Sequence, residues 1–321
     1  MMGRPVAVHV ALLAVACAAS LYVWTRDTKV ASGALAEVSV WPGRPGDVRR
    51  IALESSDKTT SLDAHEDAHG RWYSGRTQGT GTASSATPAT QFASVAAAEK
   101  IAEALAPFKA LRSIGRIDAA RASEFGLKDP SSTLIANVGG KEHRLSIGAP
   151  TPNGSDRYVR DESSGNVYAA NGDFVRALEG GASSLLEREL HEFQDADVTS
   201  VRVIALGKTR EVLHRGPATK RIWADPGSPD TADETVTNWL SKVDRMQPLE
   251  YVADPPAPPE LVVRVEYKAK GGDGLFLELA RVPGENNGRE YRIRSERTRM
   301  WCKTYTPWAE QVEQDLGSVL K

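Results

Sequence analysis

Residues 124–170 read EFGLKDPSSTLIANVGGKEHRLSIGAPTPNGSDRYVRDESSGNVYAA, and this stretch indicates an antiparallel β-meander. Apolar residues alternate on both sides of Gly139–Gly140, the small pair that a two-residue hairpin turn requires. Turn residues at Pro150–Gly154 and Ser163–Asn166 separate two further short strands. The alternating positions are Leu134, Ala136 and Val138 before the glycine pair, and His143, Leu145 and Ile147 after it.

The order of elements in this stretch recurs between Leu261 and Lys303. Each copy follows an Asp-Val strand start, a strand with a tryptophan, and a helix with apolar residues at three- and four-residue steps. The chain therefore looks like one unit used twice. The matched positions are Asp47–Val48 with Asp197–Val198, Trp72 with Trp223, and Tyr158 with Tyr291.

The predicted fold class is α+β, with an N-terminal transmembrane helix followed by two tandem repeats, each an antiparallel β-meander with covering helices. We expect residues 1–29 to form the signal-anchor, residues 30–195 the first repeat and residues 196–321 the second. Residues 74–90 of the first repeat are rich in serine, glycine and threonine, and this composition predicts a flexible linker.

The apolar stretch VAVHVALLAVACAASLYVW, residues 6–24, is long enough to cross a bilayer as a helix. A cleaved signal peptide is disfavoured because apolar character continues through Tyr22 and Trp24, which suit an interfacial aromatic belt. A lipoprotein acylated at Cys17 is disfavoured because Ala14 stands where a large aliphatic residue is usual. We expect an inner-membrane signal-anchor with the bulk of the chain on the extracytoplasmic, periplasmic side.

The composition argues against several classes of function. The 321-residue chain has a formal net charge of -2, which gives no electrostatic basis for binding nucleic acid. Cys17 lies in the apolar N-terminal stretch and Cys302 near the C-terminus, so we expect no disulfide between them. The sequence contains no glycine-rich phosphate loop before a helix, no G-x-S-x-G and no cysteine-histidine pattern with metal spacing. We therefore expect neither a cofactor nor an enzymatic activity.

A set of short motifs recurs in the predicted order, and the second copy lacks the Gly-Leu that precedes Asp-Pro in the first. This succession resembles domain-of-unknown-function family 4340. Members of that family typically have one N-terminal membrane span and an extracytoplasmic body, and they are often associated with auxiliary components of gliding-motility-type ABC transporters. The resemblance implies integral membrane partners, such as ABC transporter permease or auxiliary subunits, and it supplies no catalytic residues. The residues that carry it are Asp47–Val48, Trp72, Phe125–Pro130, Ile147–Gly148, Tyr158–Val159 and Val167–Tyr168.

Residues 65–69, HEDAH, match H-E-x-x-H, the signature of zinc proteases. On a helix, His65 and His69 would lie one turn apart and bind the metal, while Glu66 would activate water. Here the segment is polar, precedes Gly70 and lies between two predicted strands, so we expect a hairpin turn. A zinc-dependent hydrolase that uses His65, Glu66 and His69 is the alternative hypothesis.

The basic stretch REYRIRSERTRMWCK, residues 289–303, predicts a strand with one solvated face. Its alternative interpretation is a docking edge for an acidic partner, formed by Arg292, Arg294 and Trp301. Other tryptophans stand at alternating or helical spacing, which favours burial in the core over stacking on a glycan. An envelope glycan-binding module, in which these tryptophans would stack on sugar rings, is a further alternative. The favoured function is a non-catalytic, membrane-anchored scaffold or adaptor in an ABC-transporter or gliding-type envelope complex.

Overall fold

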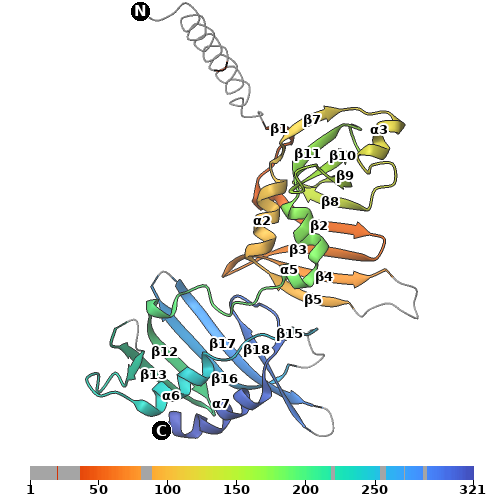
Figure 1. Ribbon diagram of the computed structural model, residues 1–321. Helices are drawn as coiled ribbons and strands as arrows, with labels where there is room; N and C mark the ends of the chain where they lie inside the picture. The colour runs from red at the N-terminus through yellow and green to blue at the C-terminus, as the bar shows by residue number, and fades with distance from the viewer. Residues whose placement is uncertain are drawn as a thin grey trace, which may run out of the picture.

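The computed structural model describes Ser20 and residues 37–80, 89–217, 221–253, 258–270, 272–284 and 288–321. Most of the regular structure in these residues is antiparallel β-sheet, arranged as two large sheets and one two-stranded sheet (Figure 1). The predicted fold class, an α+β body behind a transmembrane helix, is therefore wrong. The apolar stretch 6–24 lies outside the described residues apart from Ser20, and no described helix is both long and apolar enough to cross a bilayer.

The strands of the first large sheet are β2 (Val48–Ser55), β3 (Lys58–Asp67), β4 (Gly70–Gly79), β5 (Thr90–Ser94), β7 (Arg112–Gly115), β8 (Ser132–Val138), β9 (Lys141–Pro150), β10 (Asp156–Asp161) and β11 (Val167–Asn171). Within the described residues their spatial order is β5-β4-β3-β2-β8-β9-β10-β11-β7. The separate two-stranded sheet pairs β1 (Val38–Trp41) with β6 (Phe108–Ala110).

The strands of the second large sheet are β12 (Val198–Ala205), β13 (Lys208–Arg215), β14 (Ile222–Ala224), β15 (Glu250–Tyr251), β16 (Glu260–Ala269), β17 (Gly272–Pro283), β18 (Arg289–Ser295) and β19 (Cys302–Lys303). Their order in the described chain is β14-β13-β12-β16-β17-β18-β19-β15. When β2 is matched with β12 and β8 with β16, the two sheets have the same connectivity apart from the extra edge strand β5. The domain boundaries at residues 30–195 and 196–321 stay predictions.

Helices with one apolar side pack against the sheets. In the first half Ala98, Ile101 and Leu105 give α2 a buried stripe, and in the second half Val312 and Leu316 do the same for α7. This spacing of three and four residues places the apolar side chains on one helix face. The helices are α2 (Ala96–Leu105), α3 (Ala119–Glu124), α4 (Asp173–Gly180), α5 (Ala182–Leu185), α6 (Glu234–Val243) and α7 (Thr306–Val319), with 3-10 turns η1 (Pro45–Asp47) and η2 (Asp195–Asp197).

The segment 74–90, predicted as a flexible linker, contains strand where the structure describes it. Ser74–Gly79 belong to β4, and β4 pairs with β5 so that Gly75 lies opposite Phe92. A Cβ at Gly75 would lie 2.2 Å from the Phe92 ring, so the missing side chain allows the ring to pack on the backbone. Small residues here therefore serve close packing, and residues 81–88 lie outside the described part of the chain.

The Phe-Gly-Leu motif packs on the opposite face of the first sheet. Gly126, at φ 66°, turns the chain over β9, where the Ala149 amide donates to the Phe125 carbonyl at 2.8 Å. A Cβ at Gly148 would lie 2.3 Å from that same carbonyl oxygen. Both glycines are thus needed for close backbone approach. The turn buries a small second core, made of Leu127, Tyr158, Val167 and Ala169.

Candidate functional site: the polar seam between the two sheets

The two large sheets approach each other at their edges. Strand β15 of the second sheet lies next to β5 of the first, and the chain that links the halves passes between them. In that link, the Glu187 amide donates to the Ala93 carbonyl of β5 at 2.7 Å. The Tyr251 hydroxyl of β15 donates to the Glu187 carbonyl at 2.8 Å. The link therefore satisfies a backbone acceptor at the edge of β5 and is bound to the edge strand β15 through the Tyr251 side chain.

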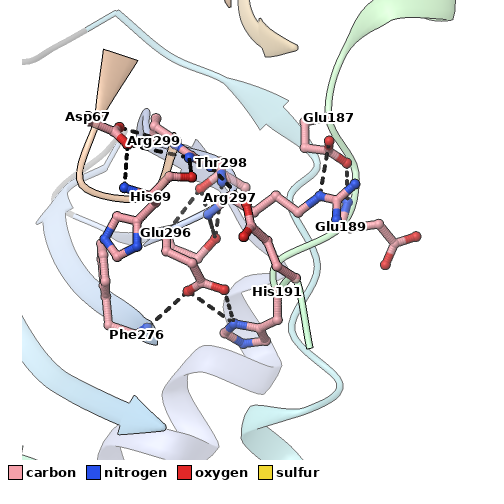
Figure 2. A network of polar contacts seen from close by, with 12 residues as sticks. Asp67, His69, Glu187, Glu189, His191, Phe276, Glu296, Arg297, Thr298 and Arg299 are labelled. Carbon is pink, nitrogen blue, oxygen red and sulfur yellow. Dashed lines mark hydrogen bonds and ion pairs between the residues drawn. The ribbon is translucent and has the colours of Figure 1, made fainter. Parts of the chain in front are cut away.

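Charged side chains gather along this junction, which we name the polar seam (Figure 2). They come from the β3–β4 hairpin of the first half, from the link, and from the turn that follows β18 in the second half. The residues of the polar seam are Asp67, His69, Glu187, His191, Glu296, Arg297 and Arg299.

The Glu187 carboxylate has two hydrogen-bond donors on one oxygen and an ion-pair partner on the other, although it is only 8% exposed. Its Oε1 accepts the backbone amides of Arg188 and Glu189, each at 3.0 Å. Its Oε2 lies 3.1 Å from the Arg297 guanidinium of the other half. A buried carboxylate needs such partners because desolvation is costly for an unpaired charge. This contact therefore ties the link to the second sheet.

Two further ionisable groups stay neutral beneath Glu187. Burial raises the pKa of the Tyr251 hydroxyl, and the neighbouring Cys302 thiol and Glu187 carboxylate act in the same direction. Burial also raises the pKa of Cys302 to about 12, and its contact with Tyr251 lowers it only partly. A thiol in this state is a poor nucleophile because the thiolate is the reactive form. Cys302 is therefore a structural residue.

His191 and Glu296 form the most deeply buried pair of the seam. The Glu296 side chain has no exposed surface and accepts the Phe276 amide at 2.9 Å. His191 Nδ1 forms a hydrogen bond of 3.0 Å with the same carboxyl group. The imidazole also stacks on Phe193, with ring centroids 4.6 Å apart, and contacts Tyr267 at 4.7 Å. These contacts fix the orientation of the ring.

A cavity of about 540 Å³ opens beside His191. The link and the end of α6 form its walls, and Leu249 at its rim is 60% exposed. It brings His191 near several polar side chains, but its lining in the described chain includes no serine, threonine or cysteine. The His191–Glu296 pair therefore has the geometry of an oriented base without a nucleophile beside it.

Arg299 joins the β3–β4 hairpin tip to the second half. Its Nε lies 3.2 Å from Asp67 Oδ2 and its Nη2 donates to the His69 carbonyl at 2.8 Å (Figure 2). The residue has φ 55°, a left-handed conformation that costs a non-glycine residue about 1–3 kcal/mol. The side chain is only 5% exposed, and Glu192 lies 3.6 Å away. These charged contacts hold the strained turn in place.

The H-E-x-x-H segment forms this hairpin tip. His65 lies within β3, while His69 follows the strand in the turn, where its amide donates to Asp67. His65 Nε2 is 2.8 Å from Ser74 Oγ, and its ring stacks on Trp72 at 4.6 Å. A strand cannot place residues four apart as helix turns do, so the geometry of a zinc protease is missing. Among the described residues no group of three or more potential ligands could hold a metal ion.

Ser74 and His65 lie at the distance of a serine nucleophile and its histidine base in a hydrolase. In such a site a third group orients the base, and backbone donors stabilise the oxyanion. No carboxylate of the described residues hydrogen-bonds to the other ring nitrogen of His65. The pair is instead a cross-strand contact on the hairpin.

The predicted docking residues lie around β18 and β19, and two of them are engaged internally. Arg294 donates from Nε and Nη2 to Glu278 at 3.0 and 2.7 Å, and its guanidinium lies 4.6 Å above the Trp301 ring. Trp301 is only 6% exposed. Arg292 buries its Nε and Nη1 without a hydrogen-bond partner in the part of the chain that the structure describes. Docking of an acidic partner by these three residues stays a prediction.

Of the residues that build the seam, sequence reasoning drew attention only to Asp67 and His69, as part of the HEDAH segment, and assigned them no contact with the second half. Glu296, Arg297 and Arg299 lie in a turn where the first half has the serine-rich turn Ser163–Asn166. A comparison of the two turns carried a usable signal, because these three charged residues stand where the first half has small polar ones. His191 carried no such signal, since one histidine in a linker has no periodicity.

In structural terms the described chain is an antiparallel β protein whose two large sheets are joined by a polar seam. The sequence model of the family described as Domain of unknown function (DUF4340) matches residues 96–264, and the chain belongs to this family. The match covers 169 of 321 residues and starts at the first residue of α2. The family prediction is confirmed, although Asp47–Val48 and Trp72 lie outside the match.

Two other comparisons add little. No curated protein matches the chain. A solved structure titled "Crystal structure of MucB" is 11% identical, with 84% of this chain and 90% of that chain covered. Its TM-score of 0.14 is too low to support an argument about fold or function.

Proposed function

We propose that this protein is a non-catalytic adaptor that works on the extracytoplasmic side of the cell envelope and binds subunits of an integral membrane complex. The observation that supports the proposal is the polar seam. Its histidine, carboxylates and guanidinium groups bond to one another and hold two sheets together, so these groups serve assembly. The resemblance noted from the sequence supports the partner class, ABC transporter permease or auxiliary subunits.

The test is co-purification of the tagged full-length protein, expressed from its own locus, in a mild detergent. A matched variant, Arg299→Met, removes the hairpin contact of the seam but retains the length of the side chain. We expect defined membrane subunits with the wild type, and at least a fivefold smaller recovery with the variant if both halves must be held in one orientation. Recovery of the wild-type protein alone would overturn the adaptor proposal.

The competing hydrolase hypothesis has its own readout. Purified protein would contain stoichiometric zinc, and His65→Ala would remove it. Peptide cleavage that depends on Glu66 would equally replace the adaptor proposal with an enzyme.

A further inference from the structure

The helices that cover the first sheet leave a groove between them. This groove, between α2 and α4, has a volume of about 720 Å³. Glu37 and β6 close one of its ends. Its apolar lining combines the buried side chains of Ile101, Phe108 and Phe174 with the exposed Ala104 and Pro107 and the half-buried Ala177.

The second half shows what fills the corresponding space there. The buried stripe of α2 and that of α6 have the same spacing, with Ala98, Ile101, Ala102 and Leu105 in one and Val236, Trp239, Leu240 and Val243 in the other. This register matches Ile101 with Trp239 and Ala104 with Lys242. The first half therefore has a smaller side chain at both positions.

Trp239 and Lys242 bind the helix that covers α6. The Trp239 indole is 1% exposed, and its Nε1 donates to the Val312 carbonyl of α7 at 2.9 Å. Lys242 Nζ lies 2.5 Å from Asp315 on the next turn of α7. The second half thus closes its helix pair with one large ring and one ion pair.

The residues of the first half that the structure describes make neither contact. Helix α4 ends at Gly180, and Gly181 at φ 60° turns the chain away, whereas α7 continues unbroken for 14 residues. Ile101 and Ala104 are too short to replace the indole and the lysine. The groove is therefore the space that a larger side chain and a longer helix occupy in the second half.

The rim of the groove carries charges that point to a protein ligand. Lys100 and Glu103 are exposed, one turn apart on α2, and neither forms an ion pair or side-chain hydrogen bond with any residue the structure describes. Alanine at positions 97, 104 and 177 lets another backbone come close, as helix pairs 8–10 Å apart require. An amphipathic helix with an acidic and a basic residue at matching spacing is complementary to this surface.

We propose that the groove between α2 and α4 binds one amphipathic helix of a partner protein. This inference rests on the proposed adaptor function. The helix places a large apolar side chain over Ala104 and Pro107, which are exposed, whereas Ile101 is only 2% exposed. It faces Lys100 with a carboxylate and Glu103 with a cation.

The experiment places a photo-crosslinking amino acid, benzoylphenylalanine, at Ala104 of the full-length protein in its own cells. The control carries the same amino acid at Ser241, an exposed position of α6 that matches Glu103. We expect a crosslink from position 104 only, mapped by mass spectrometry to a helix-forming segment of one partner. The charge-reversed variant Lys100→Glu/Glu103→Lys reduces this crosslink at least tenfold, although the net charge is unchanged.

A second measurement uses a synthetic peptide with the sequence of the crosslinked segment. Its Kd for the wild type increases at least tenfold with Ala104→Trp, which fills the groove from an exposed position, and stays unchanged with Ser241→Trp. Equal crosslinking from both positions, a crosslink to a second copy or to the same chain, or no crosslink at all overturns the groove proposal. If membrane subunits still co-purify with Ala104→Trp, the groove proposal fails and the adaptor function stands.

Discussion

Replacing His191 by phenylalanine tests whether the polar seam is a stabilising element. The change keeps a planar ring against Phe193 and Tyr267 and removes the Nδ1 hydrogen bond. Glu296, whose side chain has no exposed surface, then keeps only the Phe276 amide among the described residues. Loss of a hydrogen-bond partner from a buried polar group costs about 1–3 kcal/mol, and more when the group is charged. Because the Glu296 side chain is fully buried, we expect the upper end, about 3 kcal/mol.

A loss of about 3 kcal/mol lowers the folding equilibrium constant by roughly 150-fold, since 1.4 kcal/mol is a factor of ten. For a unit of 150–250 residues it lowers the Tm by roughly 6–12 °C. The assay is urea unfolding followed by tryptophan fluorescence and by circular dichroism, because two halves can unfold in separate steps. Trp223 and Trp239, both buried in the second half, report on that half.

The control is the double variant His191→Phe/Glu296→Leu. Apolar side chains of similar size can replace both partners of a buried hydrogen bond at little cost, so we expect its stability within about 1 kcal/mol of the wild type. If His191→Phe alone changes the unfolding free energy by less than about 1 kcal/mol, the argument from the buried carboxylate is wrong. The same holds if the double variant is less stable than the single one.

Three further measurements probe other parts of the structure. Gly75→Ala places a Cβ against the Phe92 ring and lowers stability by about 1–3 kcal/mol. Gly317→Ala in α7, where a Cβ meets nothing within 4 Å, raises stability by about 0.5–1 kcal/mol. Thermal unfolding of both variants distinguishes the steric effect on packing from the effect on helix propensity. Burial lowers the pKa of His143 below 6.5, and Lys141 adds to the effect, so the unfolded state binds more protons just below pH 6.5 and stability falls on acidification through that range. His143→Gln flattens that part of the pH profile, although His214 shifts in the same direction and retains part of the slope; an unchanged profile contradicts the assignment. In a Cys17→Ser background, we expect Cys302 to react with a thiol reagent at pH 8 only after unfolding, because the Cys302 thiol is buried and its pKa is raised to about 12. Rapid labelling of the folded protein would contradict the burial of Cys302.

The sequence by itself determined the local elements that depend on side-chain order. Alternation around Gly139–Gly140 specified the β8–β9 hairpin, because successive residues of a strand point to opposite faces. The Phe125–Pro130 motif marked the family, since its glycine serves a close backbone approach that few residues allow. The helix with apolar residues at three- and four-residue steps, expected in each copy, corresponds to α2 and α6.

Only the tertiary structure decided whether polar segments are strands or linkers. Ser74–Gly79 has the composition of a flexible linker, yet its backbone groups pair with β3 on one side and β5 on the other. Burial of Phe92 against Gly75 then stabilises the pairing, and neither contact is local in sequence. The α+β prediction was wrong for the same reason, because segments without strong alternation become strands when neighbours satisfy their hydrogen bonds.

The polar seam likewise depends on contacts between residues far apart in the chain. His191 and Glu296 are 105 residues apart, and Arg299 is 232 residues from Asp67. Sequence patterns report spacing along one element, whereas a buried ion pair requires two elements to exclude water together. The HEDAH segment is the clearest example. Its sequence matches a zinc-protease motif, but in the structure it lies in β3 and the following turn, where the His69 carbonyl accepts a hydrogen bond from Arg299 of the second half.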